Sequence, residues 1–190
     1  RVIVSNIDFT VNRGDIFVIM GGSGSGKSTI MKTLIGLKQP DSGVVMVGNT
    51  DLWHTDGEKR NKILETFGIS FQSGALFSSM TVGENVALPM ELQTQMSPQQ
   101  IAHRVTEKLA LVGLADARNL YPTEISGGMV KRAALARALA LNPEIVFFDE
   151  PSAGLDPIRS KQLDDLIVQI NRAGTTIVMV THELDSIMSI

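Results

Sequence analysis

Gly21-Gly22-Ser23-Gly24-Ser25-Gly26-Lys27-Ser28, followed by Thr29, predicts the central architecture of this chain. It fits the pattern GxxxxGKS/T, in which glycines let successive backbone N–H groups converge on phosphate oxygens. In this pattern the lysine reaches the outer phosphates, and the serine hydroxyl binds Mg²⁺. The stretch therefore predicts a phosphate loop that holds a nucleotide.

The segments around this loop predict alternating strands and helices. Apolar runs at residues 15–20, 145–148 and 176–181 predict buried strands. Apolar residues at helical spacing follow the first run up to Gly36 and recur over 158–171, so each stretch predicts a helix. This alternation predicts an α/β fold, a phosphate-loop NTPase core with a parallel sheet covered on both faces.

The middle of the chain predicts helices only. Ser97-Pro98-Gln99-Gln100 combines a helix N-cap, a first-turn proline and a capping-box glutamine, and apolar residues four apart follow it up to Gly113. Residues 130–140 are rich in strong helix formers. We expect a single domain over 1–190, with an α/β core (1–72 and 139–190) and an inserted α-helical subdomain (73–138). Because the chain starts at Arg1 and stops at Ile190 within an expected helix, we expect it to be truncated at both ends.

The composition excludes several classes of protein. The chain is 43% hydrophobic and 19% charged, as in ordinary globular proteins, and its net charge of −3 argues against a nucleic-acid surface. It has no cysteine, which excludes disulfides and fits the cytoplasm. No apolar run approaches the roughly 18 residues of a membrane span. We therefore expect no nucleic acid partner and no direct membrane insertion.

A second glycine-rich helix start follows in the helical part. Ser126-Gly127-Gly128-Met129 combines a good N-cap with two glycines, which let a ligand approach the backbone closely. The N-terminus of the following helix favours an anion. One nucleotide needs only one cradle, so the second predicts a nucleotide held by another copy of the chain.

An acidic pair ends one of the expected strands. Asp149 and Glu150 follow the apolar run 145–148, in the position of the second acidic motif of phosphate-loop ATPases. Asp149 is expected to hold Mg²⁺ through its water shell. Glu150 is expected to orient and polarise the attacking water.

With these motifs in order, the chain resembles the ATP-binding subunit of an ABC transporter. The resemblance implies that Gln72, after the expected strand 68–71, contacts Mg²⁺ or water and senses the nucleotide for membrane subunits. It implies that Asp156, in the loop 152–156, links the two sites of a dimer and that His182 contacts the γ-phosphate. The implied catalytic residues are Glu150, His182 and Gln72; the implied Mg²⁺ ligands are Ser28, Gln72 and Asp149; and the implied ATP-binding residues are Gly21, Gly22, Ser23, Gly24, Ser25, Gly26, Lys27, Ser28, Thr29, Ser126, Gly127, Gly128 and Asp156.

Within that family, residues 71–77 and 81–89 look most like the ATPases of Mla/Mce-type phospholipid transport. The implied partners are a second ATPase copy and permease subunits that dock near residues 72–90, at the cytoplasmic face of the inner membrane. In this family Ser126–Met129 corresponds to the signature motif. A signature that ends in methionine, as here at Met129, also occurs in osmolyte importers, and residues 86–92 would suit an amino-acid importer. Ile125 and Met129 replace the commonest leucine and glutamine, and the adenine-stacking aromatic would precede Arg1.

Other classes explain less of the sequence. The interval between Gln72 and Ser126 is too short for the coiled-coil insertion of DNA-repair relatives, and the tandem copies and basic linker of translation relatives are missing. A small-molecule phosphate-loop kinase would leave the signature and His182 unexplained. Outside the motifs, we expect a solvated His103 and a packing role for Trp53.

Overall fold

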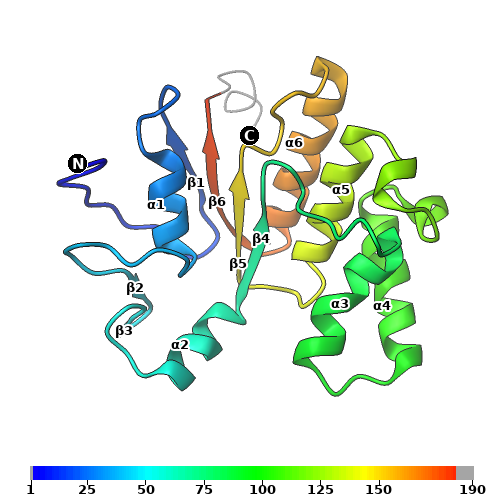
Figure 1. Ribbon diagram of the computed structural model, residues 1–190, viewed down its shortest axis with the longest axis horizontal. Coiled ribbons are helices and arrows are strands. Elements are labelled where there is room, and N and C mark those ends of the chain that lie inside the picture. The colour runs from blue at the N-terminus through cyan, green and yellow to red at the C-terminus, as the bar shows by residue number, and fades with distance from the viewer. Residues whose placement is uncertain (1, 183–190) are drawn as a thin grey trace.

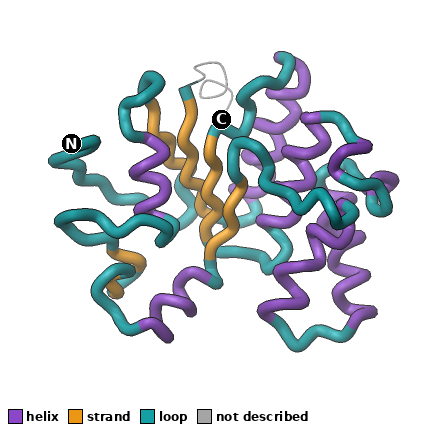
Figure 2. Tube along the Cα trace, viewed as in Figure 1, coloured by secondary structure: helices purple, strands orange, loops and turns teal. Residues whose placement is uncertain are grey.

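The computed structural model describes residues 2–182, so the helix expected at Ile190 lies outside the described residues. Figure 1 shows a central sheet with helices on both sides, and Figure 2 separates the strands from the surrounding helices and loops. The sheet contains β1 (Ile16–Met20), β6 (Thr176–Thr181), β5 (Ile145–Asp149) and β4 (Phe67–Ser70), in that order and all parallel. The prediction of an α/β fold with a parallel sheet is confirmed.

The strand register aligns the carboxyl ends of the four strands at one edge. Met20 pairs with Thr181, Asp149 pairs with Val180, and Ser70 pairs with Phe148. In parallel α/β sheets, ligands bind in the crevice outside the carboxyl ends of the strands. The loops that carry the predicted site residues therefore all leave the sheet at this edge.

Each face of the sheet is buried, because successive strand residues point to opposite sides. On one face, Phe147 and Val178 pack with Met31 of α1 (Lys27–Leu34). On the other face, Phe148 and Ile177 pack under α5 (Gly127–Ala138) and α6 (Pro157–Arg172). Phe148 is 1% exposed, and burial of such a side chain contributes about 1.5–3 kcal/mol.

The helical part lies beside β4 (Figure 1) and consists of α3 (Val82–Gln93), α4 (Pro98–Leu111), α5 and the short helices η1 (Ala115–Ala117) and η2 (Pro122–Glu124). The predicted capping box at Ser97 and Gln100 is present at the start of α4. A second capping box, formed by Thr81 and Glu84, starts α3. Val86 and Leu109 belong to the same buried cluster as Phe148, so these helices share a core with the sheet.

The remaining elements lie on the side of α1. They are β2 (Met46–Val47) and β3 (Thr50–Asp51), which form a short antiparallel pair, and α2 (Gly57–Leu64). Trp53 is a packing anchor there, as expected: its Nε1 donates to the carbonyl of Thr33 at 3.1 Å, and Arg60 stacks over its ring at 4.6 Å. His103 is solvated, also as expected, with 78% of its side chain exposed. Among the described residues, no helix has the length and apolar content needed to cross a membrane.

Candidate active site

The predicted site residues converge at the carboxyl edge of the sheet. Gly21 directly follows β1, Glu150 directly follows β5, and His182 directly follows β6. Gln72 lies two residues beyond β4. The parallel register therefore brings together four segments that are up to about 160 residues apart in sequence.

The phosphate loop has the backbone form that its glycines allow. Gly24 and Gly26 have φ values of +78° and +96°, in the left-handed region that favours glycine. No side chain caps the N-terminus of α1. A Cβ atom added at Gly22 or Gly24 would meet no atom within 4 Å, so the loop leaves open space beside its backbone. Val4 lies close to Gly26, so the open part of the loop is at Gly22 and Gly24, and an uncapped helix start beside it fits an incoming phosphate group.

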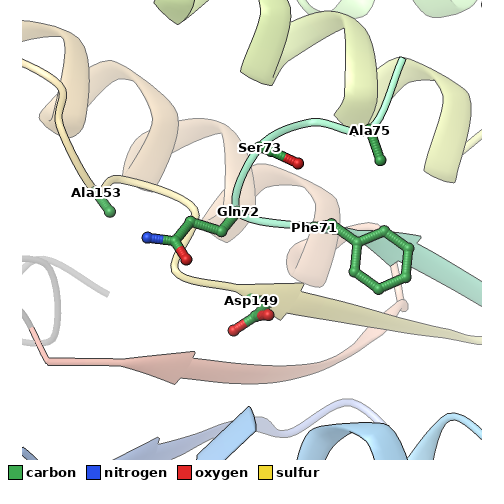
Figure 3. A pocket seen from close by; sticks show the side chains of 6 residues that line it. All are labelled: Phe71, Gln72, Ser73, Ala75, Asp149 and Ala153. Atoms are coloured by element: carbon green, nitrogen blue, oxygen red, sulfur yellow. The ribbon is translucent and has the colours of Figure 1, made fainter. Parts of the chain in front are cut away.

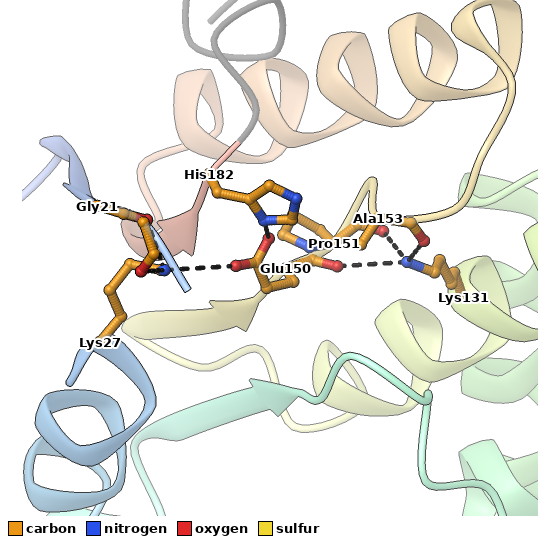
Figure 4. Close-up of polar contacts among 8 residues, drawn as sticks. Gly21, Lys27, Lys131, Glu150, Pro151, Ala153 and His182 are labelled. Atoms are coloured by element: carbon orange, nitrogen blue, oxygen red, sulfur yellow. Dashed lines mark hydrogen bonds and ion pairs between the residues drawn. The ribbon is translucent and has the colours of Figure 1, made fainter. Parts of the chain in front are cut away.

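Lys27 is folded back onto its own loop. Its Nζ donates to the carbonyl oxygens of Gly21 at 2.6 Å and Gly22 at 3.0 Å, and it lies 3.9 Å from Oε1 of Glu150 (Figure 4). The side chain is 10% exposed. The ammonium group thus lies between the phosphate loop and the acidic pair.

Glu150 occupies a constrained position between two basic groups. Its Oε2 is 2.6 Å from Nδ1 of His182, and its side chain is 10% exposed. Its backbone N–H donates to the carbonyl of Val180 at 2.9 Å, and its φ is +51°. A positive φ is uncommon for a glutamate, so the surrounding contacts must hold this conformation. The resemblance implied a phosphate contact for His182; the structure places its ring on Glu150.

Asp149 has an unsatisfied carboxylate. Burial, together with the negative charge of Glu150, raises the pKa of Asp149. Its Oδ1 is buried and has no hydrogen-bond partner among residues 2–182. Asp149 and Gln72 line an open cleft of about 570 Å³ with Phe71, Ser73, Ala75 and Ala153 (Figure 3). A bound cation would offset the repulsion between Asp149 and Glu150 and would give Oδ1 of Asp149 a partner.

The oxygen donors near this cleft suit Mg²⁺ better than a transition metal. They are the carboxylate of Asp149 and the amide of Gln72, and the resemblance implies that the hydroxyl of Ser28, at the start of α1, joins them. Within the described part of the chain, no three His, Cys, Asp or Glu side chains form a metal-binding group. Mg²⁺ is usually held by one or two carboxylates plus substrate phosphates, so this donor set fits a metal that arrives with a nucleotide.

The second glycine-rich start lies apart from the first. Ser126 caps α5 by accepting from the N–H of Met129 at 3.3 Å, and Ser126 and Gly127 are exposed. Gly128 is buried beside Arg159, and Asp156 caps α6, with Pro157 in its first turn. α1 and α5 lie on opposite sides of the sheet (Figure 1). The structure therefore does not bring Ser126 and Gly127 to the phosphate loop of the same chain.

Lys131 is a residue of this region that the sequence analysis missed. Its Nζ donates to the carbonyls of Ala153 at 2.6 Å, Pro151 at 2.8 Å and Glu150 at 3.3 Å (Figure 4). The lysine is 19 to 22 residues from these partners in sequence. No local pattern marks such a contact.

Comparisons with known proteins agree with this geometry. A family profile described as ABC transporter matches residues 4–153. The chain is 44% identical over 181 residues to the Mycobacterium tuberculosis (strain ATCC 25618 / H37Rv) "Probable ribonucleotide transport ATP-binding protein mkl", over 95% of this chain and 50% of that protein. It is 42% identical over 191 residues to the Escherichia coli (strain K12) "Intermembrane phospholipid transport system ATP-binding protein MlaF", over 100% of this chain and 71% of that protein.

A solved structure shows the same fold. The ATP-binding cassette MJ0796, in a dimeric post-hydrolysis state bound to ADP and Pi, superimposes with a TM-score of 0.89 at 33% identity, over 97% of this chain and 82% of that one. The fold and the phosphate loop define a nucleotide-binding α/β protein. This chain belongs to the ABC transporter family. It spans about half the length of the mycobacterial relatives that it matches.

Proposed function

We propose that this chain binds ATP with Mg²⁺ and hydrolyses it, as the ATPase subunit of a transporter. The observation that carries the proposal is the meeting of Lys27, Asp149 and Glu150 beside an open phosphate loop at one edge of the sheet. These are the positioning and electrostatic parts that phosphoryl transfer requires.

Each residue has a separate proposed role. Lys27 exchanges the two loop carbonyls for phosphate oxygens and offsets the charge that develops during transfer. Asp149, Ser28 and Gln72 hold Mg²⁺, which when bound neutralises phosphate charge. Glu150 polarises the attacking water and takes its proton, and His182 and Gln72 orient the groups around it. The remaining phosphate-loop residues supply backbone N–H donors.

The second nucleotide contact belongs, in this proposal, to another copy of the chain. Ser126 and Gly127 are exposed at the N-terminus of α5, which lies across the sheet from α1 and the phosphate loop of its own chain (Figure 1). The MJ0796 cassette is described as dimeric with ADP and Pi bound. We therefore assign Ser126, Gly127 and Gly128 to the ATP of the partner copy, and Asp156 to the loop between the two sites. Residues 73–138 act as the helical subdomain that carries this contact.

A membrane permease is the second proposed partner, and the ATPase would lie peripherally at the cytoplasmic face of the inner membrane. The apolar side chains that follow Gln72 are partly buried in the core and partly exposed at the surface. Val82 and Val86 are fully buried core residues, whereas Phe77 is 54% exposed. The docking surface that we propose within residues 72–90 is therefore centred on Phe77, and a short cytoplasmic helix of the permease would occupy it.

The proposed cargo is phospholipid. One relative is named for phospholipid transport and covers this chain completely, and another is named for ribonucleotide transport. Amino-acid and osmolyte import are the remaining alternatives from the sequence. The test is to co-purify the full-length protein with its membrane subunits and place the complex in liposomes. ATP-dependent transfer of a fluorescent phospholipid supports the proposal; ATP-dependent movement of a labelled ribonucleotide or amino acid instead contradicts it.

A further inference from the structure

Two strained backbone positions flank the proposed active site. Four non-glycine residues among 2–182 have a positive φ: Asn6, Ala75, Asn142 and Glu150. Asparagine tolerates this region well, whereas alanine and glutamate do not. Ala75 follows β4 shortly after Gln72, and Glu150 directly follows β5. The unexpected conformations are therefore both at the carboxyl edge of the sheet, where strain persists only if surrounding contacts hold it.

Both strained positions are held by a cation from α5. Arg137 donates to the carbonyls of Ala75 at 2.7 Å and Gly74 at 2.8 Å. Lys131 donates to the carbonyls of Glu150, Pro151 and Ala153 (Figure 4). The backbone of this turn is also held by bonds from the N–H of Ala153 to the carbonyl of Glu150 at 3.3 Å and from the N–H of Leu155 to the carbonyl of Ser152 at 3.0 Å. One ammonium group thus binds three carbonyls of the turn that starts at Glu150.

We propose that Lys131 is a positioning residue for hydrolysis: it holds the left-handed conformation of Glu150 and thereby fixes the direction of its carboxylate. The N–H of Glu150 is bound to Val180 and its carbonyl to Lys131, so loss of Lys131 would free one side of this backbone and redirect the carboxylate that starts from the same Cα. Lys131 lies on α5, across the sheet from α1 and the phosphate loop (Figure 1). Its loss should therefore affect the chemical step and leave nucleotide binding intact.

The position of Lys131 on α5 adds a consequence. It lies five residues after Ser126, which caps the same helix, so a displacement of the exposed N-terminus of α5 would be passed to the turn that carries Glu150. This inference rests on the proposed ATP hydrolysis. The inference adds to the proposed function a route by which a contact at the N-terminus of α5 reaches the carboxylate of Glu150 in the same chain.

The test compares Lys131→Met, which keeps the length but removes all donors, with Lys131→Arg, which keeps the charge and the donors. Lys62→Met is the matched control, because Lys62 is 68% exposed on α2 and pairs with Glu58 at 2.9 Å, far from the turn after Glu150 in the fold. All variants are made in the full-length protein. The readouts are kcat and KM for Mg-ATP, the Kd of a fluorescent ATP analogue, and the Tm.

For Lys131→Met we expect a fall in kcat of about 10–100-fold, with an unchanged Kd, because small misplacements of a reacting group have effects of this size. Lys131→Arg should restore most of kcat, and Lys62→Met should match the wild type. If Lys131→Met does not fold, Lys131→Gln replaces it and should lower kcat less, in the same direction.

Three results would overturn the inference: an unchanged kcat in a folded Lys131→Met protein, a loss of kcat with an equal loss of ATP affinity, or a loss that arginine does not rescue. A wild-type protein that hydrolyses no ATP would instead overturn the proposed function, and the inference with it. If the wild type hydrolyses ATP and Lys131→Met has the same kcat, only the inference is overturned.

Discussion

Nζ of Lys27 lies 3.9 Å from Oε1 of Glu150, and both side chains are 10% exposed. The cation from the start of α1 and the anion from the end of β5 therefore face one another across the space beside the phosphate loop. Because both charges are buried, each depends on the other and on its remaining hydrogen-bond partners. A nucleotide that draws Lys27 towards its phosphates changes the surroundings of Glu150 in the same step.

Lys27→Ala should reduce ATP hydrolysis by about 10²–10³-fold or more and weaken nucleotide binding, because the variant lacks the cation that would offset phosphate charge. Steady-state hydrolysis and titration with a fluorescent ATP analogue measure the two effects. Lys38→Ala is the control, since Lys38 is an exposed lysine shortly after the same helix. Turnover like that of the wild type would contradict the assignment of the phosphate loop.

Asp149→Asn should stabilise the ligand-free protein at pH 7. The pKa of Asp149 is raised in the folded state, so folding disfavours its ionised form, and neutral asparagine removes this penalty. Below the ordinary carboxyl pKa of about 3.9 the wild-type group is protonated in both states. The difference in Tm should therefore shrink as the pH falls from 7 towards 4.

Mg-ATP should reverse this order of stability and make the wild type the more stable protein. The reason is that the carboxylate of Asp149 binds Mg²⁺ better than the amide of asparagine does. Thermal scans with and without Mg-ATP measure this, and Asp165→Asn, at a carboxylate that is 63% exposed, is the control. An Asp149→Asn protein that gains as much stability from Mg-ATP as the wild type would argue against a metal role for Asp149.

Much of this fold follows from local patterns in the sequence. The caps at Ser97, Ser126 and Asp156 were all predictable, because the cap and its partner lie within three residues. The apolar runs likewise marked β1, β5 and β6. α5 begins three residues earlier than the predicted 130–140, because its cap at Ser126 starts the helix despite two glycines.

Three features of the structure were not predicted from the sequence. Two of them depend on residues that are distant in sequence, and one has a local sequence pattern. The division of residues 76–88 into core and surface depends on tertiary packing: Val82 is buried under the neighbouring helices, and Phe77 is not. The contact of His182 with Glu150 depends on the register of β5 and β6. The start of α3 was predictable from the local sequence, because Thr81 and Glu84 have the spacing of a capping box.

Ser126→Arg should prevent the ATP-dependent dimer, because a long cation would fill the space proposed for the phosphate of the partner copy. Some loss of helix stability, about 1 kcal/mol, accompanies removal of the cap. Ser126→Ala loses the cap without adding bulk and is therefore the matched control, which should still dimerise. Analytical ultracentrifugation with Mg-ATP separates the two; equal dimerisation of both variants would refute a signature contact across the interface.

Phe77→Glu should leave folding and basal ATP hydrolysis largely intact and weaken co-purification with the membrane subunits. The reason is that Phe77 is 54% exposed, so the change removes surface rather than core. Ser79→Glu, at a neighbouring exposed serine, adds the same charge without removing apolar surface. A Phe77→Glu protein that folds and still forms the complex normally would rule out docking at this residue.

The most direct test of the central claim, a nucleotide enclosed between two copies and hydrolysed with the help of Glu150, is the mass of the full-length Glu150→Gln protein with and without Mg-ATP. Glutamine keeps the shape of the side chain but cannot act as a base, so hydrolysis should fall by about 10²–10⁴-fold while binding persists. Glu144→Gln, at a side chain that is 61% exposed, is the control and should keep wild-type turnover. Light scattering should show the mass of Glu150→Gln doubling when Mg-ATP is added; a protein that stays monomeric at saturating Mg-ATP would contradict the account.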